Sequence, residues 1–294
     1  MSKIIAHGID GRVARWIGDW LGNKMQLVCV SGVMSSWRLV LSGVPQGSVL
    51  GPLRFLIFIN DLDWNLLSTI LKFADDSKIF GKAITPADRL QLQLDIDALC
   101  KWAEDWQMKF NVSKCKVMHT GPRNTNCSYF MNGQLLNSVT EHKDLGVIIS
   151  SNLKVADHCH YACNKANKML GMIKRTIKHR NITIMVQLYK TLVRPHLEYC
   201  LPVWSPYYSK DKVMLESAQH RFTRLFSELR AMSYEARLET LRLWSLEERR
   251  NRLDLTEVYK MMHGFTDVPV SSQNIGVYCS LLSHTTNAAV TAYV

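Results

Sequence analysis

The pattern of apolar positions opens with a helix. In residues 10–22 the apolar side chains recur at i, i+3, i+4, i+7 and i+8, which places on one stripe Val13, Trp16, Ile17, Trp20 and Leu21. Asp10 and Gly22 are typical start and stop residues, so we expect a helix whose stripe faces a core. Residues 25–30 and 33–41 follow as two extended segments about a Ser-Gly turn, which predicts a hairpin.

A second hairpin is predicted around two neighbouring acidic residues. Residues 69–74 and 77–80 have strand character, and Asp75 and Asp76 lie at the turn between them. At neutral pH the two carboxylates repel each other, and a bound cation offsets that repulsion. Mg²⁺ prefers oxygen ligands of this kind, and phosphoryl transfer often uses two such ions. Asp is also a common turn residue, so a purely structural turn is the alternative interpretation.

The remaining pattern alternates strands and helices. A Gly- and Pro-rich bend over residues 43–52 precedes an apolar helix that runs to about residue 63, with Arg54 inside it. Thr85 and Pro86 start a helix predicted to pack across the back of the sheet, on a stripe of Leu90, Leu94, Ala98, Leu99, Trp102 and Trp106. Strands are predicted within residues 107–119 and 143–149, with a hairpin turn at Asn132-Gly133.

Residues 154–264 read as helical, and Ser245 to Glu248 forms a capping box that opens the last long helix. Residues 266–294 are small, polar and nearly uncharged, and we expect a poorly ordered tail.

Charge adds a candidate partner. The chain of 294 residues carries a net charge of +11, and residues 154–263 hold 20 Lys and Arg against 11 Asp and Glu. A basic surface of this size favours nucleic acid as the partner, whereas a solvated basic face is the ordinary alternative. The eight cysteines show no regular framework and no apolar run approaches the length of a membrane span. We expect an intracellular protein, cytoplasmic or nuclear, that contacts no membrane.

A zinc site is a weaker alternative. Cys159 and Cys163 lie one helical turn apart beside His158 and His160, an arrangement that zinc ligands can adopt. No second pair follows at standard spacing, so the sequence favours a structural role for these residues.

Two motifs together resemble a known family. Gly43-Val44-Pro45-Gln46-Gly47-Ser48, then an apolar helix, then Phe73-Ala74-Asp75-Asp76 is similar to the polymerase core of non-LTR (LINE-type) retrotransposon reverse transcriptases. The resemblance covers about residues 1–265 and implies an α+β fold: a partial right-hand polymerase palm, an antiparallel sheet with helices, followed by a helical basic thumb. It divides the chain into a leading helix left from fingers and palm (1–24), a palm (25–150), a thumb (151–265) and the tail (266–294).

The resemblance also implies an activity and its residues. The family carries out RNA-directed DNA synthesis with two Mg²⁺ ions, an RNA template, a DNA primer and deoxynucleotides. It implies Asp75 and Asp76 as metal ligands, Phe73 near the primer end, and Pro45, Gln46 and Gly47 at the nucleotide. Lys114 would lie near the leaving pyrophosphate, with Lys116 as the competing choice, and Leu145 and Gly146 would form a primer grip. The duplex would be held by basic side chains of the thumb: Lys165, Lys168, Lys174, Arg175, Lys178 and Arg180.

One departure from the family changes the expected activity. In the family a strand that carries another metal-binding Asp precedes the segment with which this sequence opens. We therefore expect a product truncated at its N-terminal side, a reverse transcriptase domain that is inactive alone. The alternatives are a non-catalytic nucleic-acid-binding remnant and a translated pseudogene product.

Overall fold

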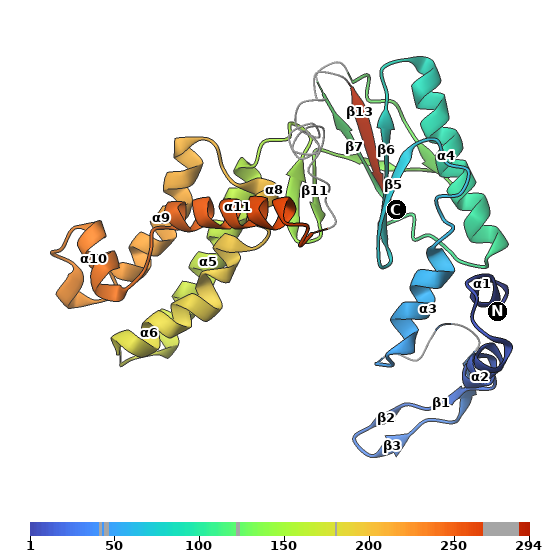
Figure 1. Ribbon diagram of the computed structural model, residues 1–294, viewed down its shortest axis with the longest axis horizontal. Helices are drawn as coiled ribbons and strands as arrows, with labels where there is room; N and C mark the ends of the chain where they lie inside the picture. Colours follow the sequence, from blue (N-terminus) through green and yellow to red (C-terminus); the bar gives the residue numbers. More distant parts are fainter. Residues whose placement is uncertain (41–42, 44–46, 122–123, 180, 267–287) are drawn as a thin grey trace.

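Two lobes make up the chain in the computed structural model, which describes all residues except 41–42, 44–46, 122–123, 180 and 267–287. A sheet lobe and the N-terminal elements lie at the right of Figure 1, and a helical lobe lies at the left. Within this described part, three separate hydrophobic clusters correspond to the N-terminal helices, the sheet and the helical lobe. The predicted mixed α+β class is confirmed.

The N-terminal helix forms as predicted but its stripe is largely exposed. Helix α2 (Gly11–Leu21) follows the short α1 (Ser2–Ala6), and the Asp10 carboxylate accepts a hydrogen bond from the Arg12 amide at 2.5 Å. Ile17 is buried, whereas Trp16 is 55% exposed. The prediction of a helix with its whole stripe in a core was therefore wrong. Spacing defines a face, but only a neighbouring element can bury it.

The N-terminal hairpin and the helix after the Gly/Pro bend are confirmed. Ser31 and Gly32 both adopt positive φ at the hairpin turn, where β2 (Cys29–Val30) pairs with β3 (Val33–Met34). Further from the turn, β1 (Met25–Gln26) pairs with β4 (Arg38–Leu39). Helix α3 (Leu50–Ile59) then begins at the predicted Gly-Pro pair and ends before the predicted end near residue 63, because the chain turns from Asn60 onward.

A five-stranded sheet forms the centre of the sheet lobe, in the order β10-β7-β13-β6-β5. Every pairing is antiparallel except that of β10 with β7. The strands, in sheet order, are Asn137–Val139, Lys116–Thr120, Ala289–Tyr293, Asp76–Lys82 and Thr69–Phe73. Helix α4 (Pro86–Asp105) packs along this sheet, as predicted, and opens with the expected Thr85–Asp88 capping box (Figure 1).

The buried face of α4 differs from the predicted stripe. Leu90 and Leu94 are 62% and 52% exposed, whereas Leu92, Ile96 and Leu99 are at most 1% exposed. The capped start of the helix and the sheet beneath it fix the rotation of α4. Two overlapping apolar stripes in one amphipathic sequence could not be distinguished by spacing alone.

The end of the chain contradicts the prediction of a poorly ordered tail. Residues 267–287 lie outside the described part, but Ala289–Tyr293 form β13, a central strand of the sheet. Val290 and Ala292 are 1% and 0% exposed and belong to the core shared with α4. The small, uncharged residues that suggested disorder are those that a crowded central strand accommodates.

Two small hairpins follow the sheet strands. The Asn132-Gly133 turn is confirmed between β8 (Phe130–Met131) and β9 (Gln134–Leu135). The single strand predicted over residues 143–149 was wrong, because β11 (Glu141–Asp144) and β12 (Val147–Ser150) form a hairpin there.

Positive φ explains that second hairpin. Leu145 has φ 44° and Gly146 has φ 91° at its two-residue turn. Positive φ at both central residues is typical of the tight turns that connect antiparallel strands.

The helical lobe is confirmed as helical, from α5 (Ala156–Thr176) to α11 (Leu246–Met262). Tyr189 and Phe222 stack with ring centroids 4.3 Å apart at the centre of its core, and the Tyr189 hydroxyl donates to Gln219 Oε1 at 2.6 Å. The predicted capping box at Ser245 is present. The other elements of the lobe are α6 (Ile182–Leu188), the π-helical η1 (Tyr189–Val193), α7 (Pro195–Glu198), α8 (Leu201–Trp204), α9 (Ser209–Thr223), η2 (Ser227–Leu229) and α10 (Tyr234–Leu241).

Within the described residues, every helix is too short or too polar to cross a lipid bilayer.

Candidate functional site

The acidic turn lies at the exposed tip of the β5–β6 hairpin. Phe73 ends β5 and pairs with Asp76, the first residue of β6, so Ala74 and Asp75 form the two-residue turn. Ala74 has φ 53°, a left-handed conformation that costs a residue with a Cβ about 1 kcal/mol. Both carboxylates are exposed, and the Phe73 ring is 63% exposed beside them. The turn therefore presents two carboxylates and one aromatic ring to solvent.

Charged groups surround the sheet face beside Asp76. Successive side chains alternate across a strand, so Asp76 and Lys78 share a face, and the register adds Tyr293 and Lys116 to it. The Lys78 ammonium pairs with the Asp144 carboxylate of β11. This ion pair attaches the β11–β12 hairpin to the sheet close to the acidic turn.

His142 of β11 completes this face. Its ring stacks on the Tyr293 ring, with centroids 3.8 Å apart. Burial lowers the pKa of His142, and the nearby Lys116 and Lys78 act in the same direction, whereas Asp144 and Asp76 raise it. The imidazole is therefore neutral at physiological pH. Lys116 and Asp76 both lie close enough to His142 to change its pKa.

The two candidate lysines occupy different places. Lys114 is exposed in the turn before β7, where its amide donates to the Asn111 carbonyl at 2.9 Å. Lys116 is half-buried in β7, on the face that carries Asp76.

The Gly/Pro bend is described only in part. Pro45 and Gln46 lie outside the described residues. Gly43 and Gly47 have φ of 95° and 81°, which favours glycine at both positions. The Ser48 hydroxyl accepts a hydrogen bond from the Gly51 amide at 3.1 Å and so helps to begin α3.

The Leu145-Gly146 turn is covered by a tyrosine of the helical lobe. The Tyr199 hydroxyl donates to the Leu145 carbonyl at 3.0 Å. A Cβ on Gly146 would lie 3.1 Å from the Tyr199 ring. Val147 of the same hairpin belongs to the helical core. The turn is therefore held by the helical lobe on one side and by the Lys78–Asp144 pair on the other.

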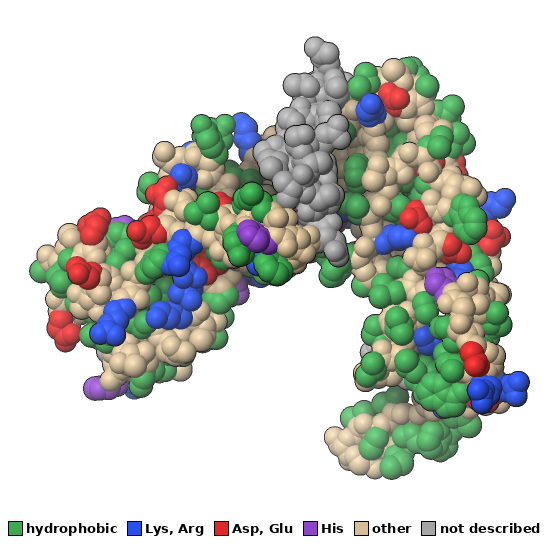
Figure 2. All heavy atoms as spheres, in the orientation of Figure 1, with side chains coloured by type: hydrophobic (Ala, Val, Ile, Leu, Met, Phe, Trp, Pro, Cys, Tyr) green, Lys and Arg blue, Asp and Glu red, His purple; other side chains and the backbone are tan. Residues whose placement is uncertain are grey.

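Five of the six predicted basic residues are exposed on or just after α5: Lys165, Lys168, Lys174, Arg175 and Lys178. Arg180 lies outside the described residues. The opposite face of α5 is buried through Ala162, Ala166, Leu170 and Ile173. Figure 2 shows Lys and Arg side chains on the helical lobe, across an open hollow from the N-terminal elements.

Tyr161 is a candidate site residue that the sequence pattern did not predict. Two ammonium groups lie close to its ring, with Lys165 Nζ 4.8 Å and Lys143 Nζ 5.4 Å from the centroid. Lys165 and then Lys143 lower the pKa of Tyr161. The four-residue spacing from Tyr161 to Lys165 was a visible signal, but the approach of Lys143 from β11 was not.

The cysteine and histidine cluster is structural. His158 Nδ1 accepts a hydrogen bond from the Ile148 amide at 3.0 Å, and its ring packs on Trp204 with centroids 4.5 Å apart. Cys159 and Cys163 are buried in the helical core. Among the described residues, no group of three or more His, Cys, Asp or Glu side chains could hold a metal ion. The contacts of His158, Cys159 and Cys163 are those of core residues.

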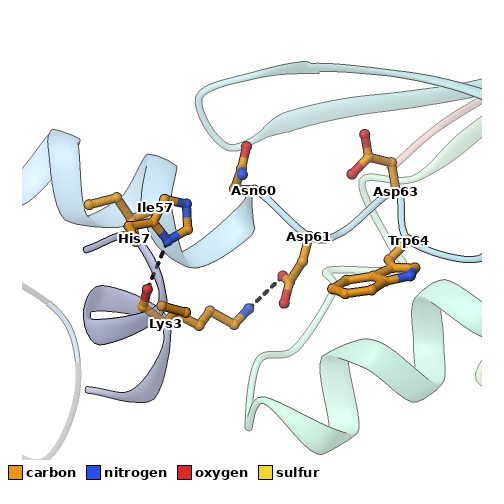
Figure 3. Close-up of a pocket in the computed structure, with 8 residues that line it drawn as sticks. Lys3, His7, Ile57, Asn60, Asp61, Asp63 and Trp64 are labelled. Carbon is orange, nitrogen blue, oxygen red and sulfur yellow. Dashed lines mark hydrogen bonds and ion pairs between the residues drawn. The ribbon is translucent and has the colours of Figure 1, made fainter. Parts of the chain in front are cut away.

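A pocket of about 350 Å³ lies beside α1 and α3 (Figure 3). Lys3 occupies one wall, where its ammonium contacts Asp61 Oδ1 at 2.5 Å and the Phe58 carbonyl at 2.6 Å. The same ammonium lies 3.7 Å from the Trp106 ring centroid. These contacts attach α1 to the sheet lobe. The pocket therefore lies where two structural elements join, and its charged residues serve that joint.

Comparisons with known proteins identify the class. The family described as "Reverse transcriptase (RNA-dependent DNA polymerase)" matches residues 1–149, which include the acidic turn and most of the sheet lobe. The chain therefore belongs to the reverse transcriptase family.

Its relatives are proteins of mobile elements. The chain is 30% identical over 201 residues to the "RNA-directed DNA polymerase from mobile element jockey" of Drosophila melanogaster, over 64% of this chain and 22% of that protein. The jockey protein of Drosophila funebris is 32% identical, over 63% of this chain and 22% of its own length. The "Retrovirus-related Pol polyprotein from type-1 retrotransposable element R1" of Bradysia coprophila is 26% identical, over 64% of this chain and 20% of its own.

These names support a reverse transcriptase domain of the LINE type. The chain spans about a fifth of the length of these relatives.

Proposed function

We propose that this chain forms the palm and thumb of a LINE-type reverse transcriptase, with the acidic turn at the polymerase centre and the helical lobe bound to the RNA–DNA duplex. The observation that carries this proposal is the placement of an exposed carboxylate pair on the sheet lobe, in a chain whose second lobe exposes a basic helix. Phosphate contacts by exposed Lys and Arg give affinity without sequence choice, which suits a polymerase.

The acidic turn suits a divalent cation by the chemistry of its donors. Asp75 and Asp76 offer carboxylate oxygens only, and hard cations such as Mg²⁺ prefer these. Asp75 and Asp76 would hold the metal, which would supply activation of the primer hydroxyl and neutralisation of the phosphate charge. The chain's own residues position the primer. The exposed Phe73 ring offers a surface for the last primer base, and the Lys78–Asp144 pair holds the Leu145-Gly146 turn near by.

Lys116 is the better candidate of the two lysines for a role beside the phosphates. It shares the sheet face of Asp76, whereas Lys114 is an exposed turn residue. A positive charge in that position stabilises a leaving pyrophosphate. In an active form of the protein, Lys116→Ala should lower kcat with little change in KM, and Lys114→Ala should not.

Two carboxylates alone supply too few ligands for two-metal chemistry, so we propose that the isolated chain does not extend a primer. The test is extension of a DNA primer on an RNA template with Mg²⁺ or Mn²⁺, with Asp75→Ala as the control variant. Extension by the unaltered chain that disappears in Asp75→Ala would overturn the proposed inactivity. Extension by both would identify a contaminant.

Binding without catalysis is the second candidate function, favoured by the exposed basic face of α5. Fluorescence anisotropy with a labelled RNA–DNA duplex should show affinity that falls steeply with salt. Lys165→Ala with Lys168→Ala should weaken binding about tenfold at low salt and reduce the salt slope by about two. Lys101→Ala with Lys109→Ala removes the same charge from the sheet lobe and serves as the matched control. Equal losses in both pairs would show that net charge, not the α5 face, binds the duplex.

A further inference from the structure

The strand β13 reaches the sheet from the far end of the chain. It inserts between β6 and β7, antiparallel to both, and its partners in the register lie more than 160 positions earlier in the sequence. Without β13, both strands would present bare edges in the middle of the sheet, a position that strongly attracts another strand. The site for β13 is therefore a channel, defined by the facing edges of β6 and β7.

The channel selects its strand on both faces. On the face toward α4, Val290 and Ala292 are buried in the core, and at 0% exposure position 292 has no room for a larger side chain. On the other face, the Tyr293 ring stacks on His142. Such alternating side-chain positions give specificity, while the backbone ladder gives affinity.

Hydrogen bonds close the channel at both ends. Near the acidic turn, the Val294 amide donates to the Ser77 carbonyl at 2.8 Å, and the Ser77 amide donates to the Val294 carbonyl at 3.2 Å. At the opposite end, the Ala83 amide donates to the Ala288 carbonyl at 3.0 Å. Asn124 Nδ2 also donates to the Ala289 carbonyl, at 2.7 Å. The site thus spans seven residues, and hydrogen bonds or strand pairing hold the bound segment along its whole length.

We propose that the channel between β6 and β7 is a strand-binding site that accepts the segment 288–294 from a second copy of this chain as well as its own. The second copy is the fitting partner because it carries the identical segment, including the small residue required at position 292. The chain's own segment is covalently tethered to the sheet lobe, and such a tether supplies an effective concentration on the order of millimolar. At micromolar concentration of the protein, each chain therefore fills its own channel with its own segment. Binding of a segment from another copy becomes measurable when the chain's own β13 can no longer pair.

The test uses a labelled synthetic peptide of residues 288–294 as the second copy's strand. In the full chain, Thr291→Pro removes a ladder donor from the centre of β13 and changes no residue of β6 or β7, the two strands that form the channel. Fluorescence anisotropy should show saturable 1:1 binding of the peptide to this variant, at least tenfold weaker binding to the unaltered chain, and no binding of a peptide carrying Ala292→Asp. Equal binding of both peptides, or no binding by a variant that keeps its α4 amide protection, would overturn the proposal.

A second measurement covers the case in which Thr291→Pro does not fold. The unaltered chain is refolded from urea with the labelled peptide at several millimolar, comparable to the tether's effective concentration. After gel filtration it should retain up to one peptide per chain, and the Ala292→Asp peptide should be lost. Failure to retain the first peptide would overturn the proposal. Neither measurement depends on polymerase activity or nucleic acid, so its outcome is independent of the proposed function.

Discussion

The sheet lobe and the helical lobe are stabilised by contacts of different range. The core of the helical lobe is built from one continuous stretch, residues 147–246, whose helices start at local caps such as Asn181 and Ser233. The core of the sheet lobe joins residues 62–136 to Val290 and Ala292 near the other end of the chain. Closing so long a loop costs entropy before any contact is gained. When the protein is destabilised, the sheet lobe should therefore unfold before the helical lobe.

The largest expected effect on stability comes from a substitution that destabilises the sheet lobe alone. Ala292→Asp places an unpaired carboxylate at a 0% exposed position, which should destabilise the lobe by at least about 4 kcal/mol. Hydrogen exchange read by mass spectrometry should show loss of protection in β6, β7 and α4, with α5 and α9 unchanged. Ala289→Asp, on the half-buried face of the same strand, is the matched control. Simultaneous loss of protection in both lobes would show that they fold as one unit.

The converse change tests the helical lobe. Phe222→Ala removes a 1% exposed ring that stacks on Tyr189 and should cost about 3–5 kcal/mol. Urea denaturation followed by hydrogen exchange should show early opening of α5, α6 and α9, while the sheet strands keep their protection. Tyr207→Ala, whose ring is 87% exposed, should leave the urea midpoint unchanged. Loss of β13 protection in Phe222→Ala would contradict independent cores.

Acid should lower the stability of the helical lobe through the buried His158. Burial, helped by Lys165, lowers the pKa of His158 to about 4, whereas the unfolded chain takes up that proton near pH 6.5. As pH falls from about 6.5 to 4, only the unfolded state binds the proton, so the helical lobe loses up to about 3 kcal/mol of stability. Above pH 7 this contribution is fully present and constant.

The control for this prediction is His158→Asn, which keeps an acceptor for the Ile148 amide and cannot titrate. Urea midpoints of the helical lobe, measured between pH 4 and 7, should fall with acid in the unaltered chain and stay nearly flat in the variant. An equal slope in both chains would assign the acid sensitivity to other groups.

The smallest expected effect is a gain in stability near the N-terminus. Arg54 is 9% exposed, its Nε and Nη1 have no hydrogen-bond partner among the residues that the structure describes, and burial lowers its pKa. Arg54→Leu removes these unpaired donors and should stabilise the region by about 1–2 kcal/mol, although the guanidinium contact with the Trp20 ring at 5.6 Å is lost. Calorimetry should show a higher Tm, with the exposed Arg15→Leu as the control. A lower Tm would mean that the ring contact outweighs the unpaired donors.

Local signals in the sequence predicted much of the candidate site. The acidic hairpin, the bend before α3 and the basic helix were each visible, because turn residues, caps and charge runs act over a few positions. The groups that surround the acidic turn were less visible. Lys116, Asp144 and Tyr293 meet there from three separate strands, and sequence spacing carries no information on such a meeting.

The amino-acid sequence by itself determined the helix starts at Thr85 and Ser245, the turn at Asp75 and the family to which the chain belongs. Only the tertiary structure decided which face of α4 is buried, that Trp16 stays exposed, and that Ala289–Tyr293 form the centre of the sheet. The physical reason is that propensity, capping and charge are properties of neighbouring residues. Burial and strand pairing depend instead on which distant segment arrives to cover a surface.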